Sequence, residues 1–210
     1  MKKIFSILAV ALIALTGAKA QDLTDNYARL YAGYNSFAFT TSGAETLNGF
    51  QLGGAYAFNV TGHKLPLFVE AGLEYNMFSK SGDNSFHAIS LPVNATYKFA
   101  VNDDFTITPY AGLIWRFGLS MKSNGVDQFE TRKSKETGLT NWEGLHRVVG
   151  LFDLGVNFTI MQHYTVGYRY SRSVNSMVHE FETTDLQGNV LAKVTGDPDV
   201  SHAITIGYVF

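Results

Sequence analysis

The last ten residues of the chain alternate between large apolar side chains and small, mostly polar ones. The large set occupies the even positions: His202, Ile204, Ile206, Tyr208 and Phe210. A strict period of two predicts a β-strand whose two faces meet different surroundings. Its length suits the roughly 9–11 residues of a tilted transmembrane strand. The pattern therefore favours a strand that crosses a bilayer.

Seven earlier segments show the same alternation, most weakly in the first of them. With the C-terminal segment they cover residues 27–37, 47–60, 67–78, 86–100, 105–119, 147–160, 163–174 and 201–210. An even number of such segments is usual in single-chain bacterial barrels. We therefore predict an all-β fold, an eight-stranded antiparallel up-and-down transmembrane β-barrel.

The connections between these segments alternate in length. Residues 61–66, 101–104 and 161–162 are short, 38–46 and 79–85 are intermediate, and 120–146 and 175–200 are long. Membrane barrels have short periplasmic turns and longer extracellular loops. This order predicts that both ends of the barrel domain lie on the periplasmic side of a bacterial outer membrane.

The first twenty residues have the pattern of a secretory signal peptide. Two lysines are followed by an apolar run over 4–16 and by small residues at Ala18 and Ala20. The run is too short to span a membrane as a helix and suits a cleaved leader. We expect a signal peptide over 1–20 and an outer-membrane barrel domain over 21–210.

Composition narrows the possible functions. The expected leader holds three of the 16 basic residues and none of the 18 acidic ones, which leaves a net formal charge of −5 on the remainder. That balance gives no support to nucleic-acid binding. The chain has no cysteine, so disulfides, thiolate metal sites and a lipidated N-terminal cysteine are excluded.

Two stretches carry a resemblance to a known family. Residues 89–112 contain the pattern L-P-x-x-x-x-Y-x-F at 91–99, followed by P-Y-x-G at 109–112. This pair resembles the outer-membrane β-barrel domain family common in Bacteroidota, PorT-like proteins among them. The C-terminal Tyr208 and Phe210 are similar to the sorting signal that the barrel assembly machinery recognises. The resemblance implies a fold and a compartment, and by analogy an accessory role in secretion.

Charged residues fall on the face opposite the apolar one. They are Arg29, Glu70, Glu74, Lys98, Arg116, Asp153 and Arg169. Because charges are costly toward lipid, we expect them to line the lumen as a structural network with its pairs satisfied. A gated ion path remains an alternative. Glu70 and Glu74, about 13 Å apart along one strand, are poorly placed to share a catalytic proton.

The six histidines do not form a recognisable metal or catalytic motif. None has the H-x-H or H-E-x-x-H spacing, and His87 and Ser90 lie on opposite faces of one strand. Hydrolytic enzymes do occur among outer-membrane barrels. The placement of His87 and Ser90 on opposite faces argues against a catalytic site made of these two residues. We expect no catalytic residues, no metal and no cofactor.

The long connections are the expected place for specific contacts. Residues 177–184 and 190–195 alternate on either side of 185–189, which predicts a hairpin, and residues 124–125 are suited to a second turn in the charged segment 120–146. We expect lipid and lipopolysaccharide as surroundings, and any protein partner at 120–146 or 175–200. The predicted function is surface interaction or envelope structure, with a small-solute or ion channel as the alternative.

Overall fold

The computed structural model describes residues 23–38, 46–80, 84–123, 126–127, 146–175, 181–184, 190–194 and 198–210. The signal peptide expected over 1–20 lies outside these ranges and stays a prediction. No helix in the described ranges is long and apolar enough to cross a membrane.

The described residues form strands and turns. The strands are β1 (Tyr27–Ala38), β2 (Thr46–Asn59), β3 (Leu67–Lys80), β4 (Asn84–Tyr97), β5 (Phe99–Asn102), β6 (Phe105–Ser123), β7 (Val126–Asp127), β8 (Val148–Ile160), β9 (Tyr164–Ser173), β10 (Phe181–Thr184), β11 (Val190–Val194) and β12 (Val200–Val209). All their pairings are antiparallel.

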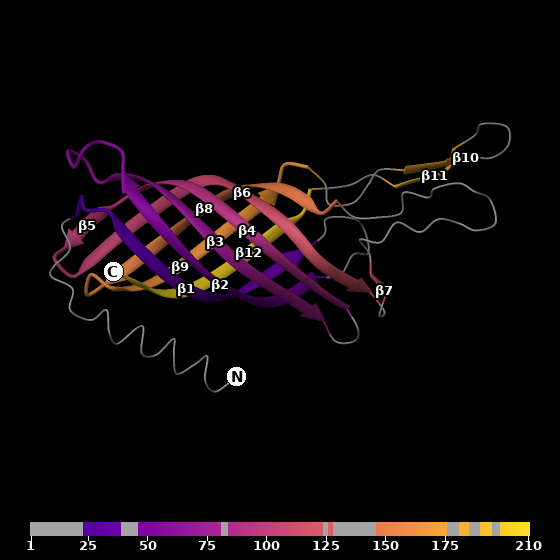
Figure 1. Cartoon of the computed structure of the whole chain (residues 1–210), viewed down its shortest axis with the longest axis horizontal. Coiled ribbons are helices and arrows are strands. Elements are labelled where there is room, and N and C mark those ends of the chain that lie inside the picture. Colours follow the sequence, from indigo (N-terminus) through magenta and orange to yellow (C-terminus); the bar gives the residue numbers. More distant parts are fainter. Residues whose placement is uncertain are drawn as a thin grey trace.

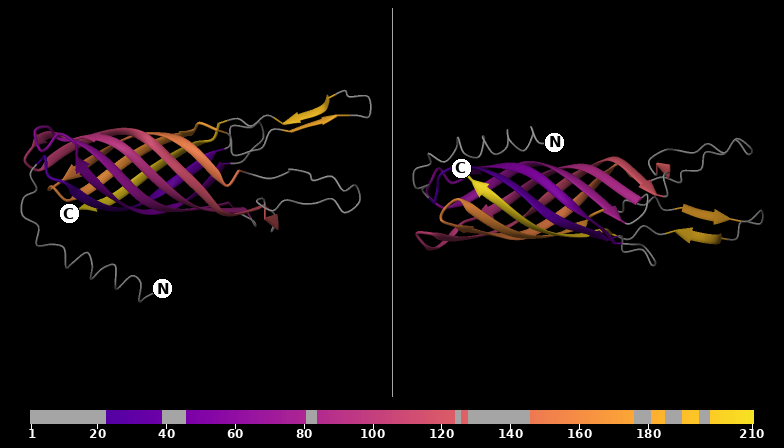
Figure 2. Two further views of the ribbon diagram at one scale, coloured as in Figure 1. Left: turned by 45° about the horizontal axis from the view of Figure 1, so that its top comes forward. Right: turned by 90° about the horizontal axis from the view of Figure 1, so that it is seen from below.

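The sheet closes on itself, which confirms the predicted eight-stranded up-and-down barrel. Each barrel strand pairs with its neighbours in the chain, β1 also pairs with β12, and β4 pairs with β6. Strands β4 and β5 together count as one of the eight barrel strands. Strands β7, β10 and β11 are not part of these eight. The strands wind obliquely around the barrel axis in Figures 1 and 2.

Two predicted strands differ most from the structure, and the boundaries of the others differ by at most two residues. The segment predicted as one strand over 86–100 starts at Asn84 and is interrupted at Lys98, where β4 gives way to β5. The register across this break is unchanged, since Thr96 faces Tyr110 and Phe99 faces Ile107. The other difference is that β6 continues to Ser123, four residues past its predicted end.

In each of the two long connections, the structure describes a pair of strands where a hairpin was predicted. Lys122 faces Asp127 across β6 and β7, and Phe181 faces Val194 across β10 and β11. The turn residues 124–125 and 185–189 lie outside the described ranges. Figure 1 places the β10–β11 ribbon past one end of the barrel.

The alternation of side chains sorts them between the two faces of the barrel wall. Phe50 and Ile206 point outward and are 64% and 66% exposed, whereas Asp153 points inward and is 0% exposed. Aromatic pairs lie toward the short-turn ends, with ring centroids 4.5 Å apart for Tyr56–Phe58. Such an apolar outer surface with aromatic rings near its edges suits a bilayer.

The short turns and the C-terminus share one end of the barrel. Met161 and Gln162 both have positive φ, 51° and 63°, and the amide of His163 donates to the carbonyl of Ile160 at 3.2 Å. Two left-handed central residues match the twist of a two-residue hairpin. By the rule of short inner turns, this end faces the periplasm.

Candidate functional site

The lumen is the part of the barrel in which polar and charged side chains gather. All seven charged residues predicted for it point inward and are 9% exposed or less. They are Arg29, Glu70, Glu74, Lys98, Arg116, Asp153 and Arg169. We call this set the lumen network. Arg29, Glu70, Glu74, Asp153 and Arg169 join in ion pairs with one another.

One ion pair lies nearer the periplasmic end. Arg29 Nη2 donates to Glu70 Oε1 at 2.7 Å, and Arg29 Nη1 donates to Asn157 Oδ1 at 3.0 Å. The two strands that carry the ion pair are β1 and β3, and Asn157 is on β8 across the lumen. The ion pair spans β2, and the contact with Asn157 crosses the interior, so Arg29 links β3 to β8.

A second, larger cluster centres on Glu74. Its Oε1 accepts from Arg169 Nη1 at 2.6 Å and from the Tyr31 hydroxyl at 2.5 Å. Arg169 also approaches Asp153, with Nε 3.4 Å from Oδ2, and Asp153 accepts from Ser171 at 3.1 Å. One arginine thus pairs with acids from two other strands, which offsets part of the cost of burying these charges.

Neutral side chains extend the hydrogen bonding toward the outer end. Asn35 Nδ2 donates to Asn76 Oδ1 at 3.0 Å and to Gln51 Oε1 at 3.3 Å, and Asn76 donates to Ser90 Oγ at 3.0 Å. All four residues are at most 4% exposed. These bonds satisfy polar groups that would otherwise be buried at a cost.

Lys98 and Arg116 lie against aromatic rings. Lys98 Nζ lies 3.8 Å from the ring centroid of Tyr27 and 4.9 Å from that of Phe68. Arg116 Cζ lies 5.4 Å from the centroid of Phe37. These distances are within cation–π range. Arg116 Nε and Nη1 have no hydrogen-bond partner among the described residues.

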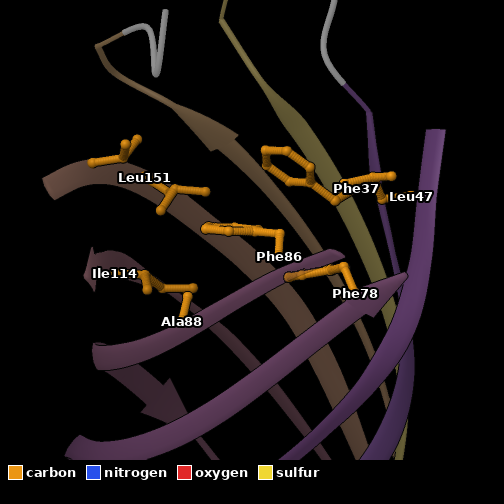
Figure 3. Close-up of a cluster of buried hydrophobic side chains, with 8 residues drawn as sticks. Phe37, Leu47, Phe78, Phe86, Ala88, Ile114 and Leu151 are labelled. Atoms are coloured by element: carbon orange, nitrogen blue, oxygen red, sulfur yellow. The ribbon is translucent and has the colours of Figure 1, made fainter. Parts of the chain in front are cut away.

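Sequence reasoning missed an apolar layer inside the lumen, which we call the phenylalanine layer. It consists of Phe37, Leu47, Phe78, Phe86, Ala88, Ile114, Val149 and Leu151, and Figure 3 shows seven of them with labels. The rings of Phe37, Phe78 and Phe86 have centroids 5.5–5.8 Å apart. Each residue of the layer lies an even number of positions from an inward-facing polar residue of its own strand, as Phe37 does from Asn35. The alternation in the sequence therefore already indicated that these apolar residues face the lumen.

One acid was also missed. Asp199, predicted to belong to an outer connection, is 1% exposed, and its amide donates to Ser173 Oγ at 2.6 Å. It is near enough to Arg116 to interact with it electrostatically, as are Glu74 and Asp153. The part of the lumen near the outer end therefore holds one more acidic residue than the sequence pattern indicated.

The other candidate groups are placed apart. Glu70 and Glu74 bind different arginines, so they do not share a proton. His87 Nδ1 contacts the Tyr75 hydroxyl at 2.7 Å, and His202 Nδ1 contacts the Tyr168 hydroxyl at 2.8 Å. In the described ranges no three His, Asp or Glu side chains gather in a way that could hold a metal ion.

The two residues of the predicted assembly signal lie together at the periplasmic end. The ring centroids of Tyr208 and Phe210 are 4.8 Å apart, and Tyr208 packs edge-on against Tyr164 at 5.6 Å. The amide of Phe210 donates to the carbonyl of Ala28 at 2.9 Å, one step beyond the last residue of β12. The C-terminus is therefore joined to β1, where the barrel closes.

Solved structures with the same fold include two outer-membrane proteins. Neisserial surface protein A (NspA) is 14% identical, with a TM-score of 0.51 and coverage of 88% of this chain and 95% of that one. The outer membrane enzyme PagL is 13% identical, with a TM-score of 0.52 and coverage of 85% and 97%. Identity this low shows the fold alone. No curated protein matches the chain.

A family model covers almost the whole sequence. The model of the outer membrane protein beta-barrel domain matches residues 5–209. The match agrees with the closed barrel, its apolar outer face and its polar lumen. The chain therefore belongs to the outer membrane protein β-barrel domain family and is a protein of the bacterial outer membrane.

Proposed function

We propose that this protein acts at the cell surface, in surface interaction or envelope structure, through the connections at its outer end. The observation that carries the proposal is that side chains fill the lumen at two levels. The ion pairs of Arg29 and Arg169 lie inside it, and the phenylalanine layer lies beyond them. An eight-stranded barrel has an interior just wide enough to be filled in this way.

The paired strands past the outer end support the same proposal. The hairpin of β6 and β7 and the ribbon of β10 and β11 both belong to connections predicted to be extracellular. Among the described residues, β10 pairs only with β11. Strand edges of this kind can add a strand from another chain. A protein partner would dock on 120–146 or 175–200.

Replacing residues 177–195 by a short Asn-Gly turn tests this function. The barrel should still insert and keep its heat-modifiable mobility, because the network and the layer are untouched. Binding of cells to host or neighbouring-cell surfaces, or resistance of the envelope to detergent, should fall. A matched replacement within 61–66, at the periplasmic end, should leave both unchanged. If loop removal alters neither property, the proposal is wrong.

The channel alternative makes the opposite prediction about ion flow. A barrel filled as described should show no large, steady conductance in a planar bilayer. Sustained openings of the unmutated monomer would favour a small-solute or ion channel over the surface function.

We also propose that the protein is not an enzyme. This is supported by the separation of the two glutamates, which bind different arginines, and of His87 from Ser90 on opposite faces of β4. The similarity to the enzyme PagL extends to the fold and carries no catalytic residue to this chain. Mass spectrometry of lipid A from cells with and without the protein is the test. A mass change that depends on the protein would show enzymatic activity.

Within the family, we propose a place among the PorT-like members from Bacteroidota. The two motif stretches lie side by side on β4 and β6, where Asn94 faces Gly112. A Cβ atom at Gly112 would lie 2.1 Å from the carbonyl oxygen of Val93, so the glycine permits the close approach. This placement would imply an accessory role in secretion. Loss of protein export in a deletion strain is the corresponding test.

A further inference from the structure

Arg172 carries a positive charge on the outward face of the barrel wall. On β9, Arg169, Ser171 and Ser173 are buried in the lumen, whereas Tyr168 and Arg172 are exposed. Arg172 is the last outward residue of this strand, so it lies at the outer end of the barrel. Among the described residues its guanidinium has no ion pair.

The acids of the eight barrel strands do not balance this charge. Glu70, Glu74 and Asp153 all point into the lumen, and Phe152 faces Arg172 in register on the neighbouring strand β8. A charge on the lipid side of a barrel costs least near the membrane interface, where the headgroups lie. The anionic headgroups of the outer leaflet therefore suit Arg172 as counter-ions.

His202 of β12 lies beside Arg172 on the same face. It faces Tyr170 in register, with ring centroids 5.4 Å apart, and its Nδ1 is 2.8 Å from the Tyr168 hydroxyl. Arg172 faces Val200, two residues from His202, and such diagonal neighbours are about 7–8 Å apart. When Tyr168 donates to Nδ1, Nε2 carries the proton and can donate to a ligand. Two tyrosines thus hold the imidazole within reach of a group bound to Arg172.

An apolar groove lies on the other side of β12 from this cluster. Its volume is about 550 Å³, and its lining runs from β12 across β1 and β2 to β3. Ile204, the next outward residue after His202, lines it. Ala32 lies in register between Ile206 and Leu52, and its short side chain leaves the space between these two larger ones. A groove of this kind on the membrane face suits hydrocarbon chains.

We propose that Arg172 and His202 bind a phosphate of lipid A, the phosphorylated glycolipid of the outer leaflet, with its acyl chains along the groove. Arginine binds phosphate oxygens in pairs, and the imidazole adds a further donor. The cluster and the groove extend from β9 to β3, four strand spacings or about 19 Å, which suits a lipid with several chains. The site is on the barrel wall, so it is independent of the surface function proposed for the connections.

The test uses the full barrel refolded in a zwitterionic detergent free of lipopolysaccharide. Native mass spectrometry counts bound molecules of bisphosphorylated lipid A, of the same lipid without its phosphates, and of phosphatidylglycerol. We expect one lipid A per barrel, bound at least tenfold more tightly than either of the other lipids. Equal binding of the dephosphorylated form would show that the cations contribute nothing. Equal binding of phosphatidylglycerol would show a surface for any anionic lipid, and either result overturns the proposal.

Variants assign the lipid to this site. Arg172→Gln combined with His202→Gln should weaken binding of lipid A at least tenfold. Ala32→Phe fills the groove with every charge kept and should weaken binding severalfold. Lys64→Gln removes an exposed charge at the periplasmic end and is the matched control, which should bind as the unmutated protein does. Heat-modifiable mobility shows that each variant is folded. Absence of bound lipid A, or unchanged binding by the folded double variant, would overturn the proposal.

Discussion

Arg169 and Glu74 form an ion pair across the lumen with 2.6 Å between Nη1 and Oε1, although 95 residues separate them in the chain. Both side chains are at most 7% exposed, and the same oxygen also accepts from Tyr31. Such a contact joins β3 to β9 through the interior, at a point where neither strand pairs with the other. It therefore stabilises the closed barrel as well as the two residues.

Removing the charge of Glu74 should destabilise the barrel strongly. Glu74→Gln leaves Arg169 buried without its closest acid, and loss of one partner of a buried pair costs about 3–5 kcal/mol. The measurement is the urea midpoint of the refolded protein. Asp25→Asn is the control, because its ion pair with His63 is more than half exposed and is expected to contribute at most about 1 kcal/mol. Equal midpoints for the two variants would contradict a stabilising network.

Thinning the phenylalanine layer should weaken the barrel and let ions through. Phe78 is 0% exposed and contacts the rings of Phe37 and Phe86, so Phe78→Ala leaves a cavity at a cost of about 3–5 kcal/mol. Planar-bilayer recordings should show brief openings that the unmutated protein lacks. Phe50→Ala, on the lipid face, removes the same ring without opening the lumen and should stay silent. Silence of both variants would mean that the ion pairs alone close the lumen.

Alanine should be tolerated at one glycine of β8 and not at the other. A Cβ at Gly155 would lie 2.4 Å from the Tyr110 hydroxyl and 2.4 Å from the carbonyl oxygen of Tyr168. At Gly150 the nearest atom is 3.6 Å away, an ordinary contact. We expect Gly155→Ala to lower the yield of heat-modifiable protein severalfold and Gly150→Ala to leave it unchanged. Equal yields would show that the wall can move to accept the extra atom.

Deleting Phe210 should impair insertion into the outer membrane. The deletion removes the ring that packs on Tyr208 and the amide that donates to Ala28, where the first and last strands meet. We expect less heat-modifiable protein in the outer membrane, with export to the periplasm unchanged. Phe210→Tyr keeps both contacts and should assemble normally. Full assembly of the truncated chain would exclude the terminal residue as a signal.

The sequence alone determined the strands and the side of the wall that each residue faces. A period of two leaves two choices for a strand, and the charges at Arg116 and Asp153 decide between them, because a charge facing lipid is costly. The number of strands and the alternating lengths of the connections then predicted a barrel. All of this depends on residues near each other in the chain.

The tertiary structure decided which inward residues meet. Arg29 selects Glu70, and Arg169 selects Glu74 and Asp153, because closure fixes how far each strand is shifted along the barrel axis. The same shift brings Phe37, Phe78 and Phe86 to one height as a layer, although parity marked them only as inward. It also places Thr106, Thr159 and Thr165 at one height on three neighbouring strands. A repeat of two residues sets the face of the wall but not the height in the lumen, and height decides the contacts.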